Sequence, residues 1–383
     1  MAHDVHLRTP AGRPRARALG IPFDGTPGAL NAITDVPGVE VGYATLIDGD
    51  GPLVVGRGPV RTGVTAIHPR GRADPGTPCA AGFYSLNGNG EMTGTVWIEE
   101  AGALSLPVTI TNTHAVGIAQ EATIAWTTER HPELTSVWAL PVAAETWDGY
   151  LNDINGRHVT REVALAALDG ARGGPLEEGS VGGGTGMNCY HFKGGSGTAS
   201  RRVAHGPDEH TVGVFAQANF GAREELVIAG VPVGRELLDD DPMADPAWLA
   251  PPGAGSVIVV VATDAPLLPG QCKALARRVP LGLARTGTTG SHFSGDIFLA
   301  FSTANHGQLA LGLNDAGGEY GTLRFIPWTR MDALFAAVVH ATEEAVLNAL
   351  CAAEEMLGAD GRRSPGLPHA RVTELLAARG VRA

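Results

Sequence analysis

The residues with the clearest chemical potential lie at one junction, about two thirds of the way along the chain. A stretch rich in Asp, Pro and Gly over residues 238–255 ends at Ser256, and a continuous apolar run over residues 256–262 follows directly. If the bond between Gly255 and Ser256 breaks, Ser256 gains an α-amine whose unperturbed pKa of about 7.7–8.0 allows it to accept the hydroxyl proton at neutral pH. Gly255 has no Cβ, which lets a nucleophile approach its carbonyl. The same pattern also fits a serine that simply begins a strand after a loop.

Two other short patches carry polar side chains at the ends of predicted strands. Ser294 and Asp296 lie in a turn rich in Gly and Thr that leads into an apolar run over residues 296–303, where they can relay hydrogen bonds to a nucleophile. Asn219 ends the strand predicted over residues 211–218, where its amide can donate to an oxyanion. Either patch also fits an ordinary turn in which Ser, Asp and Asn satisfy nearby backbone groups.

Five longer motifs occur in a fixed order, and together they resemble the family of L-aminopeptidase/D-Ala-esterase/amidases and β-peptidyl aminopeptidases. The motifs are AITDVPGVEVG, EGSVGGGTGMNCYHFKGG, QANFG, GSVIVVVATDAPLLP and SGDIFLAFSTAN. The resemblance runs from about residue 20 to about residue 355 and is greatest to the D-Ala-esterase/amidase branch. Several long motifs in one order form a specific signal, which none of them provides alone.

This resemblance implies a self-processing serine aminopeptidase. The chain is expected to cleave itself into residues 1–255 and residues 256–383, which stay together as one domain. The new N-terminal Ser256 is then the nucleophile, Ser294 matches the serine beside it, and Asp296 matches a nearby acidic residue. The implied substrates are peptides, amino-acid amides and esters with a free amino terminus, and no metal or cofactor is expected.

The resemblance also assigns residues that hold the substrate. Asn219 matches an oxyanion-binding Asn, while Glu145 and Trp138 match residues of the pocket for the substrate's amino group. Trp147 stands where the family is expected to carry a Tyr that helps to bind the oxyanion. An indole N–H donates one hydrogen bond and accepts none, so this donor and the size of the pocket stay open. Tyr150, three residues further on, is a possible replacement.

Apolar periodicity places these residues on a mixed α/β framework. The predicted strands cover residues 61–68, 107–111, 136–142, 211–218, 227–233, 256–262 and 296–303, and the predicted helices cover residues 113–130, 267–280, 330–357 and 370–379. Strands and helices do not alternate cleanly, which favours helices covering packed sheets over a doubly wound sheet. The resemblance implies a four-layer αββα sandwich, usually assembled as a homotetramer.

Composition argues against several other classes of protein. The formal net charge is −12 and no long stripe of Lys and Arg occurs, so nucleic-acid binding is not expected. Neither a secretory signal nor an apolar stretch of membrane-spanning length is found, which predicts a cytoplasmic protein without a membrane partner. The four cysteines are far apart and predict buried thiols, not a disulfide framework or a zinc site. The arginines within residues 8–17 are predicted to form a solvated N-terminal arm.

Three alternatives to a self-processing aminopeptidase stay open from the residues. The first is an acyltransferase or a hydrolase of non-peptide amides on the same fold, although such relatives begin their cleaved subunit with Thr where this chain has Ser256. The second is a non-catalytic protein that binds a small molecule through the Gly-rich loop over residues 179–196, which predicts an intact chain of 39.5 kDa. The third is a degenerate family member that stays uncleaved because Trp147 spoils the pocket.

Overall fold

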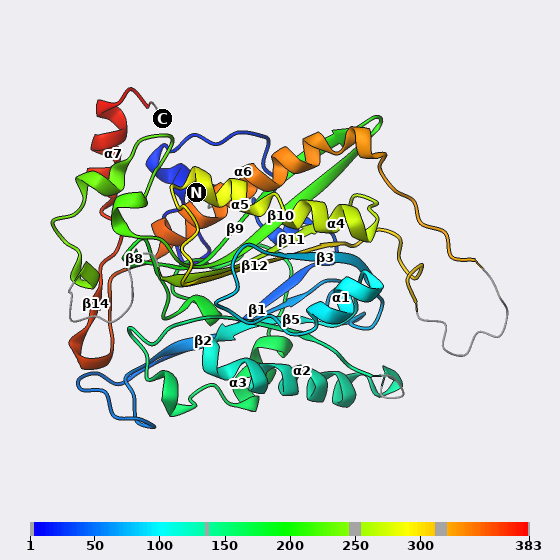
Figure 1. The fold of residues 1–383 in the computed structure, drawn as a ribbon, viewed down its shortest axis with the longest axis horizontal. Coiled ribbons are helices and arrows are strands. Elements are labelled where there is room, and N and C mark those ends of the chain that lie inside the picture. Colours follow the sequence, from blue (N-terminus) through cyan, green and yellow to red (C-terminus); the bar gives the residue numbers. More distant parts are fainter. Residues whose placement is uncertain (1–3, 135–137, 245–253, 311–319, 382–383) are drawn as a thin grey trace.

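Two β-sheets lie face to face, and helices cover the outer face of each sheet (Figure 1). The computed structural model describes residues 4–134, 138–244, 254–310 and 320–381. The order of layers is helix, sheet, sheet, helix, which is the αββα sandwich that the family resemblance implied.

The larger sheet has six strands in the order β4-β3-β12-β11-β10-β9. Its strands are β3 (Cys79–Ser85), β4 (Ala103–Leu104), β9 (Gly195–His205), β10 (Asp208–Asn219), β11 (Gly255–Thr263) and β12 (Ser294–Ser302). The central strand β11 pairs antiparallel with β10 and parallel with β12. The apolar run that follows the Gly–Ser junction therefore forms the middle of the molecule.

The smaller sheet has four strands in the order β1-β2-β5-β6. These are β1 (Glu40–Asp48), β2 (Val60–His68), β5 (Val108–Asn112) and β6 (Val142–Thr146). Residues 136–142 were predicted to form a strand, but the strand begins only at Val142; residues 135–137 lie outside the described part of the chain. The shift places Glu145 inside β6, near its carboxyl end.

Alternation along β11 explains why this strand has no polar face. Ile258 and Val260 belong to the apolar core between the two sheets, whereas Val257 and Val259 belong to the core between the larger sheet and its helices. Successive side chains of a strand point to opposite faces. Ser256 therefore shares the face of Ile258 and points toward the smaller sheet.

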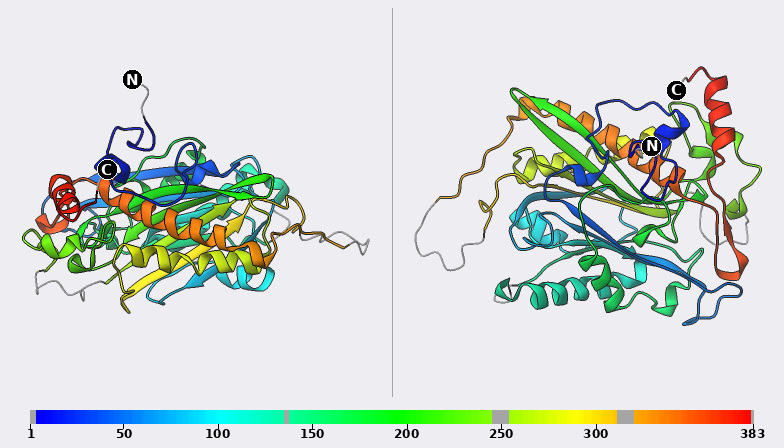
Figure 2. Two further views of the ribbon diagram at one scale, coloured as in Figure 1. Left: turned by 90° about the horizontal axis from the view of Figure 1, so that it is seen from above. Right: turned by 180° about the vertical axis from the view of Figure 1, so that it is seen from behind.

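Helices complete the outer layers, and their bounds are α1 (Thr95–Ala101), α2 (Val116–Arg130), α3 (Arg161–Asp169), α4 (Pro269–Ala276), α5 (Val279–Arg285), α6 (Asp332–Ala352) and α7 (His369–Ala378). Helices α4, α5 and α6 cover the larger sheet, while α2 and α3 cover the smaller one. Among the described helices, α6 alone is long and apolar enough to cross a membrane, but it lies against β9 and β10 and is mostly buried there (Figure 2).

The N-terminal segment is not the solvated arm that its composition predicted. The Arg15 side chain is buried, and its Nε donates to the Glu178 carboxylate at 2.7 Å. Arg17 donates to Glu344 on α6 at 2.6 Å. A buried guanidinium is tolerated because a carboxylate and several carbonyls satisfy it. The segment before β1 therefore docks across the larger sheet and its longest helix.

Two other predictions about elements were wrong. Residues 227–233 form no strand but a tight turn, in which Ile228 bridges Val231 before a short 3-10 helix. The single helix predicted over residues 267–280 is two helices, α4 and α5, with Pro269 at the beginning of the first. Proline fits the first turn of a helix because its missing N–H has no intrahelical acceptor there.

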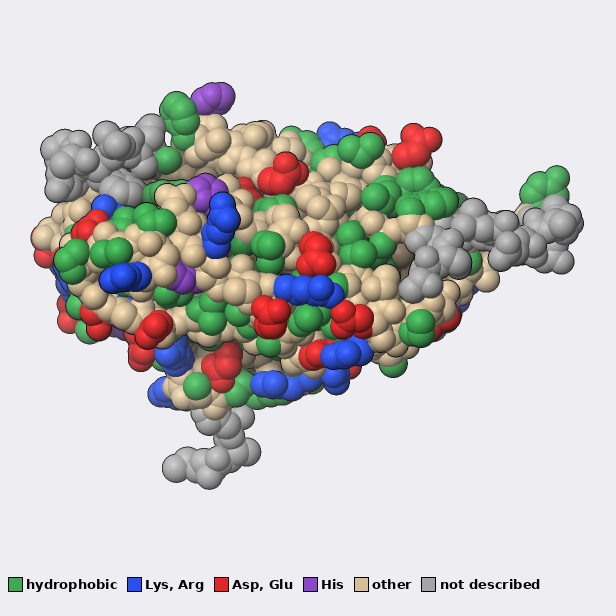
Figure 3. All heavy atoms as spheres, turned by 90° about the horizontal axis from the view of Figure 1, so that it is seen from below, with side chains coloured by type: hydrophobic (Ala, Val, Ile, Leu, Met, Phe, Trp, Pro, Cys, Tyr) green, Lys and Arg blue, Asp and Glu red, His purple; other side chains and the backbone are tan. Residues whose placement is uncertain are grey.

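The four cysteines are buried thiols, as their spacing predicted. Acidic and basic side chains are interspersed on the face seen in Figure 3, and no patch of Lys and Arg dominates it. All four cysteines are buried and free, and burial raises the thiol pKa of each. Among the described residues, no group of three or more His, Cys, Asp and Glu side chains is arranged to hold a metal ion.

Candidate active site

A cavity of about 450 Å³ opens where the ends of β10 and β11 meet. Asn219, the last residue of β10, lies opposite Ser256 in the antiparallel register, and both residues line the cavity. Six residues named from the sequence share this cavity: Glu145, Trp147, Tyr150, Asn219, Gly255 and Ser256. The fold therefore gathers residues that are more than 100 positions apart in the chain.

The Gly255–Ser256 bond forms part of the cavity wall. The side chain of Ser256 is buried, at 1% relative exposure, and points toward the smaller sheet. A Cβ on Gly255 would lie 2.0 Å from the backbone oxygen of Asn219, so no larger residue fits without a backbone shift. The glycine is required by this close approach, and it leaves one side of its own carbonyl unhindered by a side chain.

Asn219 is fixed in one orientation by two backbone groups. Its Oδ1 accepts the Asn188 N–H at 2.8 Å, and its Nδ2 donates to the Trp147 carbonyl at 2.9 Å. These contacts determine which end of the amide is nitrogen. An amide nitrogen has two hydrogens, so a second donor remains available beside Ser256. This geometry suits a group that stabilises an oxyanion.

Ser294 and Asp296 form a hydrogen-bonded pair, at 2.5 Å from Oγ to Oδ1. In the parallel register Ser294 lies opposite Gly255, so its side chain points away from the face that Ser256 occupies. Burial raises the pKa of Asp296, while hydrogen bonds from Ser294, Asn87 and the Val257 backbone oppose the shift. The pair therefore adjoins the backbone on both sides of the Gly–Ser bond and does not line the cavity.

Glu145 brings a negative charge to the opposite part of the cavity wall. Its carboxylate accepts the Glu91 backbone N–H at 3.0 Å and also accepts the Thr113 hydroxyl. The pKa of Glu145 lies above its ordinary value, mainly because of burial and also because of the nearby charge of Glu91. The two hydrogen bonds oppose this shift but do not cancel it. A buried carboxylate of this kind is stabilised by a cationic partner. An ammonium group is the natural complement.

The two aromatic residues near Glu145 behave differently from one another. The indole of Trp147 lines the cavity and lies over Gly149, where a Cβ would be only 2.4 Å from the ring. Tyr150 also lines the cavity, but its hydroxyl donates to the Arg363 carbonyl at 3.3 Å. Its proton is therefore directed away from Ser256, and the proposal that Tyr150 replaces an oxyanion donor gains no support.

Trp138 is the one predicted substrate-binding residue that the fold does not bring to the cavity. Its side chain is half exposed and packs edge-on against Trp97, with ring centroids 5.8 Å apart. Within the described chain it is absent from the cavity wall. The residues that sequence reasoning missed are Glu91, Thr113, Asn188 and His191. Asn188 and His191 lie inside the motif over residues 178–195, which gave neither of them a chemical role, and Glu91 and Thr113 lie outside the quoted motifs.

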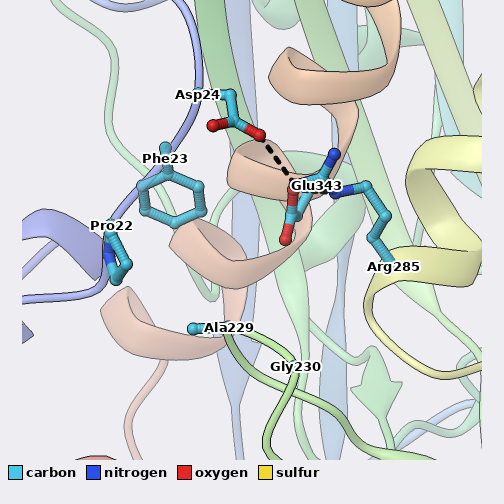
Figure 4. Close-up of a pocket in the computed structure, with 7 residues that line it drawn as sticks. All are labelled: Pro22, Phe23, Asp24, Ala229, Gly230, Arg285 and Glu343. Atoms are coloured by element: carbon cyan, nitrogen blue, oxygen red, sulfur yellow. Dashed lines mark hydrogen bonds and ion pairs between the residues drawn. The ribbon is translucent and has the colours of Figure 1, made fainter. Parts of the chain in front are cut away.

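A second hollow lies on the outer side of the larger sheet, and its seven lining residues are drawn in Figure 4. Arg285 lies between two carboxylates there: its Nε is 2.6 Å from Glu343 and its Nη2 is 3.0 Å from Asp24. The charges in this hollow satisfy one another, and its lining includes no Ser, Thr or Cys. The chemistry therefore belongs to the cavity at Ser256.

A serine hydroxyl, an amide donor and a buried carboxylate in one cavity are the groups that a hydrolase for amides with a free amino terminus needs. Comparison with known proteins agrees with this class. The model of peptidase family S58 matches residues 31–364, and the chain belongs to this family. It is a serine-type aminopeptidase.

Several relatives are similar over nearly their whole length. The beta-peptidyl aminopeptidase BapA of Sphingosinicella microcystinivorans is 50% identical over 371 residues, covering 95% of this chain and 92% of the relative. The solved L-aminopeptidase D-Ala-esterase/amidase of Ochrobactrum anthropi, described as a variant of the N-terminal-nucleophile hydrolase fold, has a TM-score of 0.90 at 45% identity, covering 97% and 100%. The beta-aminopeptidase of a Burkholderia species has a TM-score of 0.87 at 46% identity, covering 96% and 100%.

Proposed function

We propose that the chain cleaves its own Gly255–Ser256 bond and then uses Ser256 as an N-terminal nucleophile against peptides, amides and esters with a free amino group. One observation carries the proposal: Ser256, Asn219 and Glu145 face one cavity, and the bond to be cleaved forms part of its wall. The similarity to an N-terminal-nucleophile hydrolase supports it.

In the self-cleavage step, the Ser256 hydroxyl attacks the Gly255 carbonyl. The peptide C–N bond breaks as the acyl group moves to oxygen, and the nitrogen becomes the α-amine of Ser256. Water then hydrolyses the ester, which leaves a carboxylate on Gly255 and restores the hydroxyl. The Ser294–Asp296 pair lies opposite this bond in the sheet, which supports a role in holding the new amine by hydrogen bonding.

In the mature enzyme, the α-amine accepts the proton as the hydroxyl attacks the substrate carbonyl, and later gives it to the leaving amine. The second Nδ2 hydrogen of Asn219 stabilises the oxyanion. Water hydrolyses the acyl-enzyme. Glu145 binds the substrate's ammonium group, so only the first residue of a peptide reaches Ser256. The reported relatives are aminopeptidases or an esterase/amidase, which favours hydrolysis over acyl transfer.

Release of amine from β-alanyl and D-alanyl amides tests this function directly. The wild-type protein is expected to hydrolyse at least one of these amides. The same amide with an acetylated amino group is expected to resist hydrolysis. Ser256→Ala should abolish hydrolysis, while Ser180→Ala, a buried serine outside the cavity wall, should retain it. Equal activity of the wild type and Ser256→Ala would remove Ser256 from the mechanism.

The homotetramer and the cytoplasmic location expected from the sequence stay predictions. Exposed large apolar side chains support self-association, since an aqueous surface rarely gathers them without a partner. Phe325 and Trp328, in the segment between β12 and α6, are about half exposed, and Tyr320 is fully exposed. Light scattering on the purified protein measures the assembly: a mass of four chains is expected, and a monomer would contradict it.

A further inference from the structure

His191 lines the cavity at the tip of the hairpin formed by β7 (Asn188–Cys189) and β8 (Phe192–Lys193). Tyr190 and His191 have φ angles of 53° and 57°, the two positive values of a type I′ turn. Buried Arg223 fixes this turn, since it donates to the carbonyls of Tyr190 at 3.0 Å and of His191 at 2.6 Å. The histidine is thus held on a rigid support.

The imidazole of His191 is also oriented. Its Nδ1 lies 2.9 Å and 3.1 Å from the two carboxylate oxygens of Asp241, so Nδ1 carries a hydrogen. Burial raises the pKa of Asp241, but His191 and Arg223 together hold it below its ordinary value. Nε2 makes no hydrogen bond within the described part of the chain. One end of the ring is therefore anchored, and the other end is left for a ligand.

Contacts between neighbouring segments place this histidine and Glu145 on opposite sides of Ser256. Glu145 contacts the loop at Gly90, which packs against β12. Ser256 lies on the next strand, β11, and Asn219 ends β10 beyond it. The hairpin of the histidine is tied to that far side, because the Asn188 N–H donates to Asn219 Oδ1. A substrate whose amine lies at Glu145 extends its leaving part toward the hairpin.

We infer that His191, positioned by Asp241, binds the free carboxylate of the leaving amino acid, so that the enzyme favours dipeptides over longer peptides and dipeptide amides. A protonated imidazole donates from both nitrogens, here to Asp241 through Nδ1 and to the ligand through Nε2. Arg223, whose Nη2 is 3.9 Å from Asp241, offsets the charge of that carboxylate. This inference rests on the proposed function and narrows its substrate class.

A free carboxylate on the second residue distinguishes a dipeptide from its amide and from longer peptides. An amide cap removes the charge at that end, and a third residue moves the carboxylate one residue further from the scissile bond.

The test compares β-alanylglycine with β-alanylglycinamide, using wild type, His191→Asn and His205→Asn. Asn is chosen because it tolerates the positive φ of the turn. The control His205 lies at the opposite end of β9 from the cavity, about 33 Å along the strand. In the wild type, kcat/KM for the free acid is expected to exceed that for the amide at least tenfold, and His191→Asn should lower this ratio about ten- to hundredfold through KM.

The control His205→Asn should keep the wild-type ratio. Two results would overturn the inference: a wild type without preference for the free acid, or a His191→Asn variant that loses both substrates equally. If the wild type hydrolyses neither substrate, the proposed function fails, and calorimetric titration with the same two ligands tests the subsite alone. At least tenfold tighter binding of the free acid supports the subsite, and equal affinities refute it.

Discussion

Replacing Glu145 by Gln is expected to weaken binding of the substrate's amino group without disturbing the framework. Oε1 accepts the Glu91 N–H and Oε2 accepts the Thr113 hydroxyl. Gln keeps the same shape, accepts the first bond and donates the second, because a hydroxyl accepts as well as donates. The negative charge is lost. A hydrogen bond to a charged group contributes about 1.5–3 kcal/mol, which corresponds to a rise in KM of about ten- to hundredfold.

Steady-state kinetics on an amino-acid amide measures this change. The ammonium contact exists in both the bound substrate and the transition state, so KM is expected to rise while kcat changes little. Glu99→Gln is the matched control, because Glu99 is exposed and pairs with Lys273 away from the cavity. A Glu145→Gln variant with wild-type KM, or one that loses only kcat, would refute the assignment of Glu145 to the substrate's amine.

The same variant tests whether the raised pKa of Glu145 makes the stability of the protein depend on pH. Burial raises the pKa of Glu145, so the folded state binds this proton more tightly than the unfolded chain. Wild-type stability should therefore fall as the pH rises from about 4 toward neutrality, and Gln, which does not titrate, should escape this loss. Thermal unfolding at pH 4 and pH 7 should show Glu145→Gln gaining stability over wild type at the higher pH. If Glu145→Gln instead loses stability relative to the wild type between pH 4 and pH 7, the pKa of Glu145 is not raised in the folded state.

Three other substitutions probe the framework around the nucleophile. Asn219→Ala should lower kcat about 10²–10³-fold by removing the proposed oxyanion donor. A Michaelis–Menten comparison that finds unchanged kcat contradicts this role. Gly255→Ala should slow chain cleavage and lower the melting temperature, because the new Cβ meets the backbone oxygen of Asn219. Gel analysis over time measures the cleavage, and calorimetry measures the melting temperature. A variant that matches the wild type in both would disprove the steric argument. Burial lowers the pKa of Lys193 to about 7, so the free energy of unfolding of the wild type should rise between pH 7 and pH 10. In urea unfolding, Lys193→Met should lose this pH dependence. The same pH dependence in both proteins would mean that Lys193 does not titrate in this range.

The central framework could be predicted because strong local patterns coincide with it. The apolar run after Ser256 became β11, and the Ala-rich helix became α6. Both segments are mostly buried, so their apolar character is continuous. The C-terminal boundary of the helix was wrong, because α6 ends at Ala352 and not at residue 357. The position of Asn219 at the end of a strand could be predicted because it directly follows the apolar run over residues 211–218. These elements position Ser256, the proposed nucleophile, and Asn219, its proposed oxyanion donor.

The remainder depends on contacts between distant segments. Arg15 looked like part of a solvated arm, since nothing near it in sequence shows that Glu178 offers a buried partner. The run over residues 227–233 is apolar because it packs into the core as a turn, not because it pairs as a strand. His191 lies inside a quoted motif that gave it no chemical role, and its place at the cavity follows only from a hairpin and from Asp241, 50 positions away.

The measurement that tests the central claim most directly is the intact mass of the purified protein, with N-terminal sequencing of each fragment. Two polypeptides, covering residues 1–255 and 256–383 with Ser256 at the second N-terminus, are the predicted result. Ser256→Ala should remain one chain under the same conditions. A wild-type protein that stays at 39.5 kDa after long incubation, or that is cut at any other bond, would contradict the account of Ser256 as a self-released nucleophile.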